Sequence, residues 1–201
     1  FSTNLLTYVN GLPYNFGLRN FDKVYASMVA ITGVDPLTTT SSSANGEPIK
    51  DVYKEIRGAL PSVEDAVTFV PANQVAVSRL SFEFCNALVD SPTLRGSFFT
   101  GFNFAGNMAT AFDAAGQTAM VDSLYANIVG TGIGNQLTNA SLADVLLYNV
   151  DDPSTLEVSE ASLFIGLSDE CTTDCASNAR VMKVAKSMCI AVLGSASMLL
   201  H

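Results

Sequence analysis

The spacing of hydrophobic residues along the chain predicts a mainly helical protein. Hydrophobic residues recur at intervals of three and four, the period of a helix with one buried face, in several separate segments. The first follows Asn20, a favourable N-cap, and ends at Gly33 and Asp35-Pro36. The second begins at Pro48 and ends at Pro61. Their predicted inward positions are Phe21, Val24, Met28 and Ile31, then Ile49, Val52, Tyr53 and Ile56.

The strongest periodic pattern covers residues 71–90 and predicts a central helix. One stripe of this segment is hydrophobic and the opposite stripe is polar, as in a helix packed on a core. The hydrophobic stripe consists of Val77, Leu80, Phe84, Cys85 and Leu88, and the polar stripe of Asn73, Arg79, Glu83 and Asp90.

The remaining segments predict shorter helices and one long closing helix. Capping-box patterns at Ser62 and Ser141 predict helix starts, the second opening a helix over 142–150. Residues 96–116 fit a short helix, an apolar loop and a second short helix, and a further helix is expected over 117–129. The closing helix starts at Asp174 or Ser177, and its apolar second half predicts a buried hub. Residues 154–170 fit either strand or helix.

Two segments lack helical periodicity. Residues 1–18 contain scattered Asn, Gly and Pro and predict an extended arm, whereas the polar run 38–46 predicts a surface loop without packing contacts. The sequence therefore predicts an all-α protein with a single compact domain of about seven helices over 19–201, preceded by the arm over 1–18.

Composition and charge narrow the class of protein. The 201 residues are 48% hydrophobic and only 14% charged, which indicates a packed globular chain. The net charge of −9 disfavours nucleic acid as a partner. Between Gly96 and Ala179 there are ten acids and no Lys or Arg, so this stretch carries −10 and the rest +1. No apolar stretch reaches the roughly 18 residues needed for a membrane span.

The four cysteines allow three complete pairings. Cys85 and Cys189 lie in apolar helical segments and could meet across the core, whereas Cys171 and Cys175 flank a loop that can bend. The favoured disulfides are therefore Cys85–Cys189 and Cys171–Cys175, typical of an oxidising compartment. A buried free thiol remains open for Cys85 and Cys189, and zinc is disfavoured because the only histidine is the terminal His201.

The motifs of common enzymes are missing from the sequence. There is no G-x-S-x-G elbow and no histidine placed as a general base, so no catalytic residue is predicted and no enzyme is expected. Carboxylates that could bind Ca²⁺ are Asp151, Asp152, Glu157, Asp169, Glu170 and Asp174, although a solvated acidic face is favoured over a calcium site. The phenylalanine-rich segment 98–112 is a candidate lining for a small-ligand pocket. No other cofactor is predicted.

Three segments carry a resemblance to a known group of proteins. The segments LRNFDKVYASMVAITGV, VAVSRLSFEFCNALVDSPTLR and VMKVAKSMCIAVLGSASML resemble the C-terminal α-helical region of large bacterial envelope proteins that also carry laminin-G-like modules. The laminin-G-like module itself has no counterpart in this chain, so carbohydrate binding is not implied. The resemblance implies a secreted or surface-exposed bacterial protein with no assigned activity.

These observations lead to a functional expectation. The start at Phe1 without Met predicts a processed product, which agrees with the cysteines in favouring an extracellular or cell-surface location. We expect a structural or interaction protein that assembles with itself into a filament or surface layer, with its arm packing on a neighbour through Phe1, Leu5, Leu6, Tyr8 and Val9. The alternative is a calcium-binding or small-ligand-binding surface module.

Overall fold

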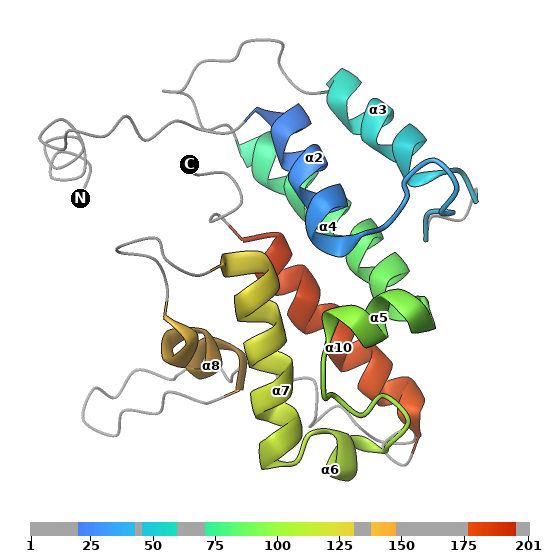
Figure 1. Cartoon of the computed structure of the whole chain (residues 1–201). Coiled ribbons are helices and arrows are strands. Elements are labelled where there is room, and N and C mark those ends of the chain that lie inside the picture. The colour runs from blue at the N-terminus through green and yellow to red at the C-terminus, as the bar shows by residue number, and fades with distance from the viewer. Residues whose placement is uncertain (1–19, 43–45, 60–70, 131–137, 148–176, 196–201) are drawn as a thin grey trace, which may run out of the picture.

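The computed structural model describes residues 20–42, 46–59, 71–130, 138–147 and 177–195, and these residues form an all-α fold (Figure 1). The predicted fold class is therefore confirmed, while the arm over 1–18 lies outside the described residues. Within them no strand occurs, and the one isolated β-bridge joins Thr40 and Pro48. The helices are α2 (Phe21–Thr32), α3 (Ile49–Ala59), α4 (Pro71–Asp90), α5 (Pro92–Phe98), α6 (Met108–Ala111), α7 (Ala114–Leu124), the π-helix η1 (Tyr125–Val129), α8 (Asn139–Leu147) and α10 (Asn178–Leu193).

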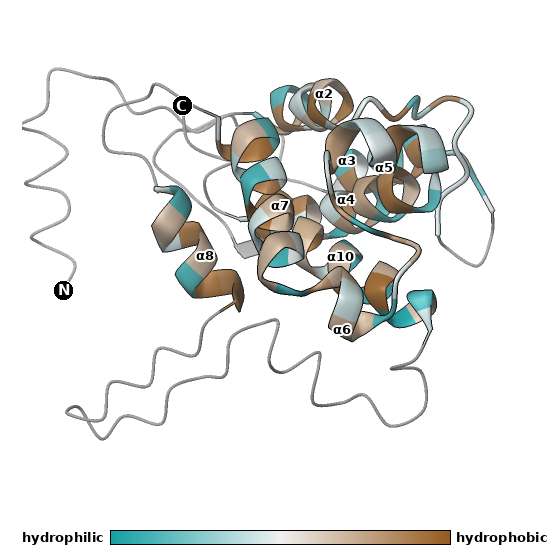
Figure 2. Cartoon of the chain, turned by 60° about the horizontal axis from the view of Figure 1, so that its bottom comes forward, coloured by the Kyte–Doolittle hydropathy of each residue, from teal (hydrophilic) through white to brown (hydrophobic). Residues whose placement is uncertain are grey.

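The centre of the fold is the pair α4 and α10. Helices α2 and α3 pack on one side of this pair, and α7 followed by α8 on the other (Figure 1). The helices carry both hydrophobic and hydrophilic positions around their circumference, as expected of helices around a shared core (Figure 2). The predicted hydrophobic stripe of α4 is completely buried, and the helix has the bounds that the pattern over 71–90 predicts.

A disulfide joins the two central helices. Cys85 of α4 and Cys189 of α10 are fully buried, with their Cα atoms 5.8 Å apart. This is the pair that the sequence favours; Cys171 and Cys175 lie outside the described residues.

Two further contacts hold α10 against α4. A Cβ on Gly194 would lie 2.7 Å from Oγ of Ser81, so glycine is needed where α10 ends against α4. Lys186 of α10 adds an ion pair of 2.7 Å with Asp90 at the end of α4.

The ends of α2 agree with the local capping signals. Asn20 accepts a hydrogen bond of 2.9 Å from the backbone N–H of Lys23, and Gly33 has the left-handed φ of 66° that favours glycine. Both were predicted because caps of this kind depend on residues only a few positions apart.

The loop before α3 differs from the prediction. Ser41 is buried and its backbone N–H donates to the carbonyl of Glu47 at 2.7 Å, while the N–H of Ser42 donates to Oε2 of Glu83 at 2.6 Å. The expectation of a loop without packing contacts is wrong. Glu83, which the pattern assigns to the polar stripe of α4, is buried, with an exposure of only 4%. The loop folds over α4 and supplies the hydrogen bond that a buried carboxylate needs.

Two helix starts are displaced from their predicted positions. Helix α7 begins three residues before Gln117 because the side chain of Asp113 accepts a hydrogen bond of 2.8 Å from the N–H of Gly116. Helix α8 begins before Ser141 because Thr138 acts as the cap, its Oγ1 accepting from the N–H of Ser141 at 3.1 Å. In both cases a nearby polar residue capped the helix in place of the expected one.

The closing helix α10 confirms the predicted hub. It begins at Asn178 after Ser177, and its buried side chains include Val181, Val184, Met188 and Val192. It ends at Leu193, earlier than the apolar run of the sequence, whose last part lies outside the described residues.

Candidate functional site

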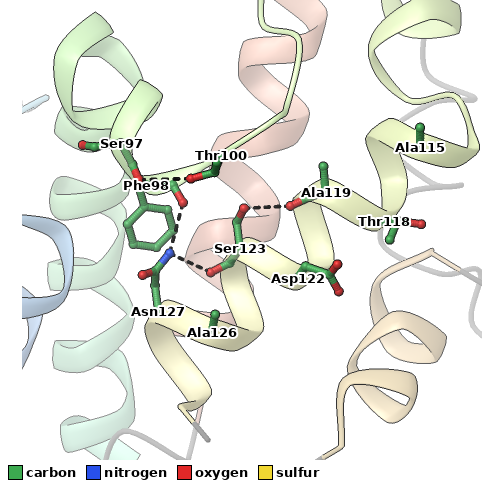
Figure 3. Close-up of a pocket in the computed structure, with 10 residues that line it drawn as sticks. All are labelled: Ser97, Phe98, Thr100, Ala115, Thr118, Ala119, Asp122, Ser123, Ala126 and Asn127. Atoms are coloured by element: carbon green, nitrogen blue, oxygen red, sulfur yellow. Dashed lines mark hydrogen bonds between the residues drawn. The ribbon is translucent and has the colours of Figure 1, made fainter.

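A groove of about 650 Å³ lies between the end of α5 and the continuous helix formed by α7 and η1 (Figure 3). Most of its lining side chains are small or polar. Ala115, Thr118, Ala119, Asp122 and Ala126 recur at intervals of three and four, so they share one face of the helix. The lining is completed by Ser97, Phe98, Thr100, Ser123 and Asn127.

Asn127 connects the two walls of the groove. Its Nδ2 donates to the carbonyl of Phe98 at 3.0 Å and to the carbonyl of Ser123 at 2.9 Å (Figure 3). Asn127 belongs to η1, the π-helical continuation of α7, and π-helical turns are often found at functional sites. The pattern over 117–129 predicted a regular helix, so the sequence carried no signal for this bridge.

The hydroxyl groups of the groove donate to nearby backbone carbonyls, and those of Ser97, Thr118 and Ser123 do so within their own helices. Ser123 donates to the carbonyl of Ala119 at 2.7 Å, Thr118 to that of Ala114 at 2.9 Å, and Ser97 bonds within α5. A serine nucleophile needs a neighbouring base instead, and these bonds place none beside the hydroxyls.

Asp122 is the charged residue of the groove lining. One of its carboxylate oxygens accepts a hydrogen bond of 2.6 Å from Nδ2 of Asn139, the first residue of α8. This contact ties α8 to α7 beside the groove. Because Asp122 is exposed, its carboxylate can also meet an incoming N–H or cation.

The phenylalanines of segment 98–112 pack mainly on one another. The rings of Phe98 and Phe99 lie 4.7 Å apart, those of Phe99 and Phe104 5.5 Å, and those of Phe102 and Phe112 4.9 Å. All five phenylalanines are buried, and only Phe98 belongs to the lining of the groove. The segment therefore holds α5 against α6 and contributes one ring to the candidate site.

The predicted acidic surface falls largely outside the described residues. Of the ten acids between 96 and 179, only Asp113, Asp122 and Asp144 are among the described residues. All the described residues together contain nine Lys and Arg and ten Asp and Glu, which gives them a net charge of −1. The candidate calcium ligands Asp151, Asp152, Glu157, Asp169, Glu170 and Asp174 also lie outside them, as do the arm residues Phe1, Leu5, Leu6, Tyr8 and Val9.

Neither a metal-binding cluster nor a membrane-spanning helix is found in the described part of the chain. No group of three or more His, Cys, Asp or Glu side chains there is placed to hold a metal ion. No helix in those same ranges is long and apolar enough to cross a membrane.

Comparison of the chain with models of protein families, with curated proteins and with solved structures gave no match. The resemblance to bacterial envelope proteins therefore stays a prediction from the three segments of sequence.

Proposed function

We propose that this chain is a secreted or cell-surface bacterial protein that self-associates as a subunit of an extracellular filament or surface layer. The observation that carries the extracellular location in this proposal is the disulfide between Cys85 and Cys189, which is buried at the centre of the fold. Stable disulfides form in oxidising compartments and are rare in the cytosol. A bond that joins the two central helices favours folding in such a compartment.

The groove beside α7 supports the self-association. Its small side chains, among them Ala115, Ala119 and Ala126, allow the backbone of another segment to approach the helix closely. The hydroxyl groups already donate to nearby backbone carbonyls, so an incoming segment leaves few unpaired donors behind. We assign a structural role to this surface and not a catalytic one.

The occupant that we propose is the segment 1–18 of a second copy. None of the side chains of this segment is charged, so their burial in a groove of small side chains carries no cost of desolvating a charged side chain. Fully extended, 18 residues span at most about 60 Å, several times the radius of gyration of about 17 Å expected for a compact chain of this size. The apolar residues available for the contact are Phe1, Leu5, Leu6, Tyr8 and Val9.

The test compares the assembly of four forms of the chain. Sedimentation velocity and negative-stain microscopy, over a series of protein and salt concentrations, measure the assembly of the full chain, of a variant lacking 1–18, and of Ala115→Arg, which fills the groove. The matched control is Ala26→Arg, which changes an alanine that is also exposed, on the far helix α2. Each measurement is repeated with Ca²⁺ and with EGTA.

The proposal predicts that the full chain and Ala26→Arg assemble, while the truncated chain and Ala115→Arg stay monomeric. A full chain that is monomeric at every concentration, with and without Ca²⁺, contradicts self-association. Assembly of Ala115→Arg to the same extent as Ala26→Arg contradicts the groove as the contact surface. Assembly that appears only with Ca²⁺ supports the calcium-binding alternative instead.

A further inference from the structure

Helices α2 and α3 meet through a stack of aromatic rings. The rings of Tyr25 and Tyr53 lie nearly parallel, with their centroids 3.9 Å apart and an angle of 18° between their planes. Phe21 lies 5.7 Å from Tyr53 at an angle of 12°, and Phe84 of α4 meets Tyr25 edge-on at 5.9 Å. Both tyrosines are partly exposed, so the stack is held by the core and still reaches solvent.

The phenol of Tyr53 has a proton acceptor in place. Its hydroxyl donates to Oδ1 of Asp22 at 2.6 Å, and Nε of Arg57 lies 2.8 Å from the same oxygen. Such a short hydrogen bond to a carboxylate is of the strong, charge-assisted kind. The ion pair with Arg57 keeps the carboxylate pointing at the phenol.

Both phenols are protonated at neutral pH. Burial, followed by the hydrogen bond and negative charge of Asp22, raises the pKa of Tyr53 to about 12. Burial and the charge of Asp35 raise the pKa of Tyr25 above its ordinary value. Oxidation of either ring therefore requires the loss of a proton with the electron, and Asp22 provides a route for the proton of Tyr53.

We propose that Tyr25 and Tyr53 form a site of oxidative cross-linking, in which a one-electron oxidant of the haem-peroxidase class joins the two rings as dityrosine. Each phenol loses one electron to the oxidant and one proton, that of Tyr53 to Asp22. The two radicals couple through ring carbons next to the hydroxyls, and the hydrogens on these carbons then move to the oxygens. The two electrons and two protons reduce one hydrogen peroxide to two waters.

The stack favours this pair over other tyrosines. A new carbon–carbon bond requires two rings in contact, and the 3.9 Å between the centroids is already contact distance. The other described tyrosine, Tyr125, lies on η1 in a different part of the fold. The bond would join α2 to α3 as the disulfide joins α4 to α10, whether or not the chain self-associates.

The experiment treats the folded full chain with a haem peroxidase and limiting hydrogen peroxide, then maps the product by trypsin digestion and mass spectrometry. Tyr25 lies in the peptide 24–50 and Tyr53 in the peptide 51–54. We expect these two peptides to be joined, with a mass two hydrogens below their sum, and the product to show dityrosine fluorescence. Tyr25→Phe and Tyr53→Phe should lose this link, while the matched control Tyr125→Phe should keep it.

A second oxidant tests whether a missing cross-link means only that the haem peroxidase cannot reach the two tyrosine rings. Photo-generated ruthenium(III) takes one electron without a binding site, so absence of the 24–50 to 51–54 link with both oxidants overturns the proposal. Equal dityrosine fluorescence in Tyr53→Phe and Tyr125→Phe, each with a native circular dichroism spectrum, overturns it as well. Asp22→Asn should slow the initial rate of cross-linking several-fold at neutral pH, and an unchanged rate overturns the assignment of Asp22 as the proton acceptor.

Discussion

Reduction of the disulfide between Cys85 and Cys189 should strongly destabilise the fold. The bond closes a loop of 104 residues, and the loss of conformational freedom that such a cross-link imposes on the unfolded chain is worth about 4.7 kcal/mol at 25 °C for a loop of this length. Because each kcal/mol moves the thermal midpoint of a chain of this size by about 2–4 °C, reduction should lower the midpoint by roughly 10–20 °C.

The assay isolates this one bond. Cys171→Ser/Cys175→Ser serves as the background, so that dithiothreitol acts on Cys85 and Cys189 alone. Urea and thermal unfolding, followed by far-ultraviolet circular dichroism, give the free energy of unfolding with and without dithiothreitol. The control is the same background with Cys85→Ala/Cys189→Ala, whose stability should not respond to dithiothreitol.

The double alanine variant should be less stable than the reduced protein. Both sulfur atoms are fully buried, and removal of each should cost about 1 kcal/mol, comparable to the deletion of one buried methyl group. A loss on reduction below about 2 kcal/mol, the lower end for native disulfides, would refute the loop-closure reasoning. An equal loss in the alanine control would show that dithiothreitol acts elsewhere.

Three further perturbations test other parts of the fold. Gly116→Ala should lower the free energy of unfolding by roughly 1–3 kcal/mol, because the added Cβ would overlap a backbone carbonyl of α6. The matched Gly58→Ala, on the open face of α3, should raise it by about 0.5–1 kcal/mol. Urea denaturation measures both changes. Glu83→Ala should cost about 1–3 kcal/mol and speed hydrogen exchange in the loop above it, while Glu55→Ala, at an exposed ion pair, should cost less than about 1 kcal/mol by the same measurement. Since the pKa of Tyr53 is raised to about 12, the stability it contributes should be complete below its unfolded value of about 10 and disappear as the pH rises towards 12. Tyr53→Phe should reduce this loss of stability with pH in urea titrations, leaving the part due to the raised pKa of Tyr25; a slope equal to that of the unmodified chain would contradict the prediction.

Local signals in the sequence predicted much of the fold. The ends of α2 depend on Asn20 and Gly33, which act on residues only three or four positions away. Helix α4 was predicted with both of its ends because twenty residues of regular periodicity leave little choice of register. The pairing of Cys85 with Cys189 followed from their place on two apolar helices.

The failures concern residues whose neighbours are distant in the sequence or chemically similar. Glu83 belongs to the polar stripe of α4, so its burial was not expected from the pattern. Its burial is favourable because the N–H of Ser42, 41 residues earlier, donates to its carboxylate. Thr138 and Ser141 are equally good caps, so the choice between them depends on how α8 meets α7. The groove could not be predicted, because Asn127 and Phe98 are 29 residues apart and their contact arises from packing.

The disulfide also gives the chain the topology of a ring. The described helices from α5 to α8, and α10 as far as Cys189, lie within the closed segment between Cys85 and Cys189. Helices α2 and α3 with most of α4 form a tail before this segment, and the end of α10 belongs to a second tail after it. A protease that cuts once inside the ring opens it but releases no fragment, since both new ends remain covalently attached. Two cuts are needed before any piece of the ring can leave. A single nick in this segment is therefore visible only after reduction, and the nicked chain keeps both halves of its core together.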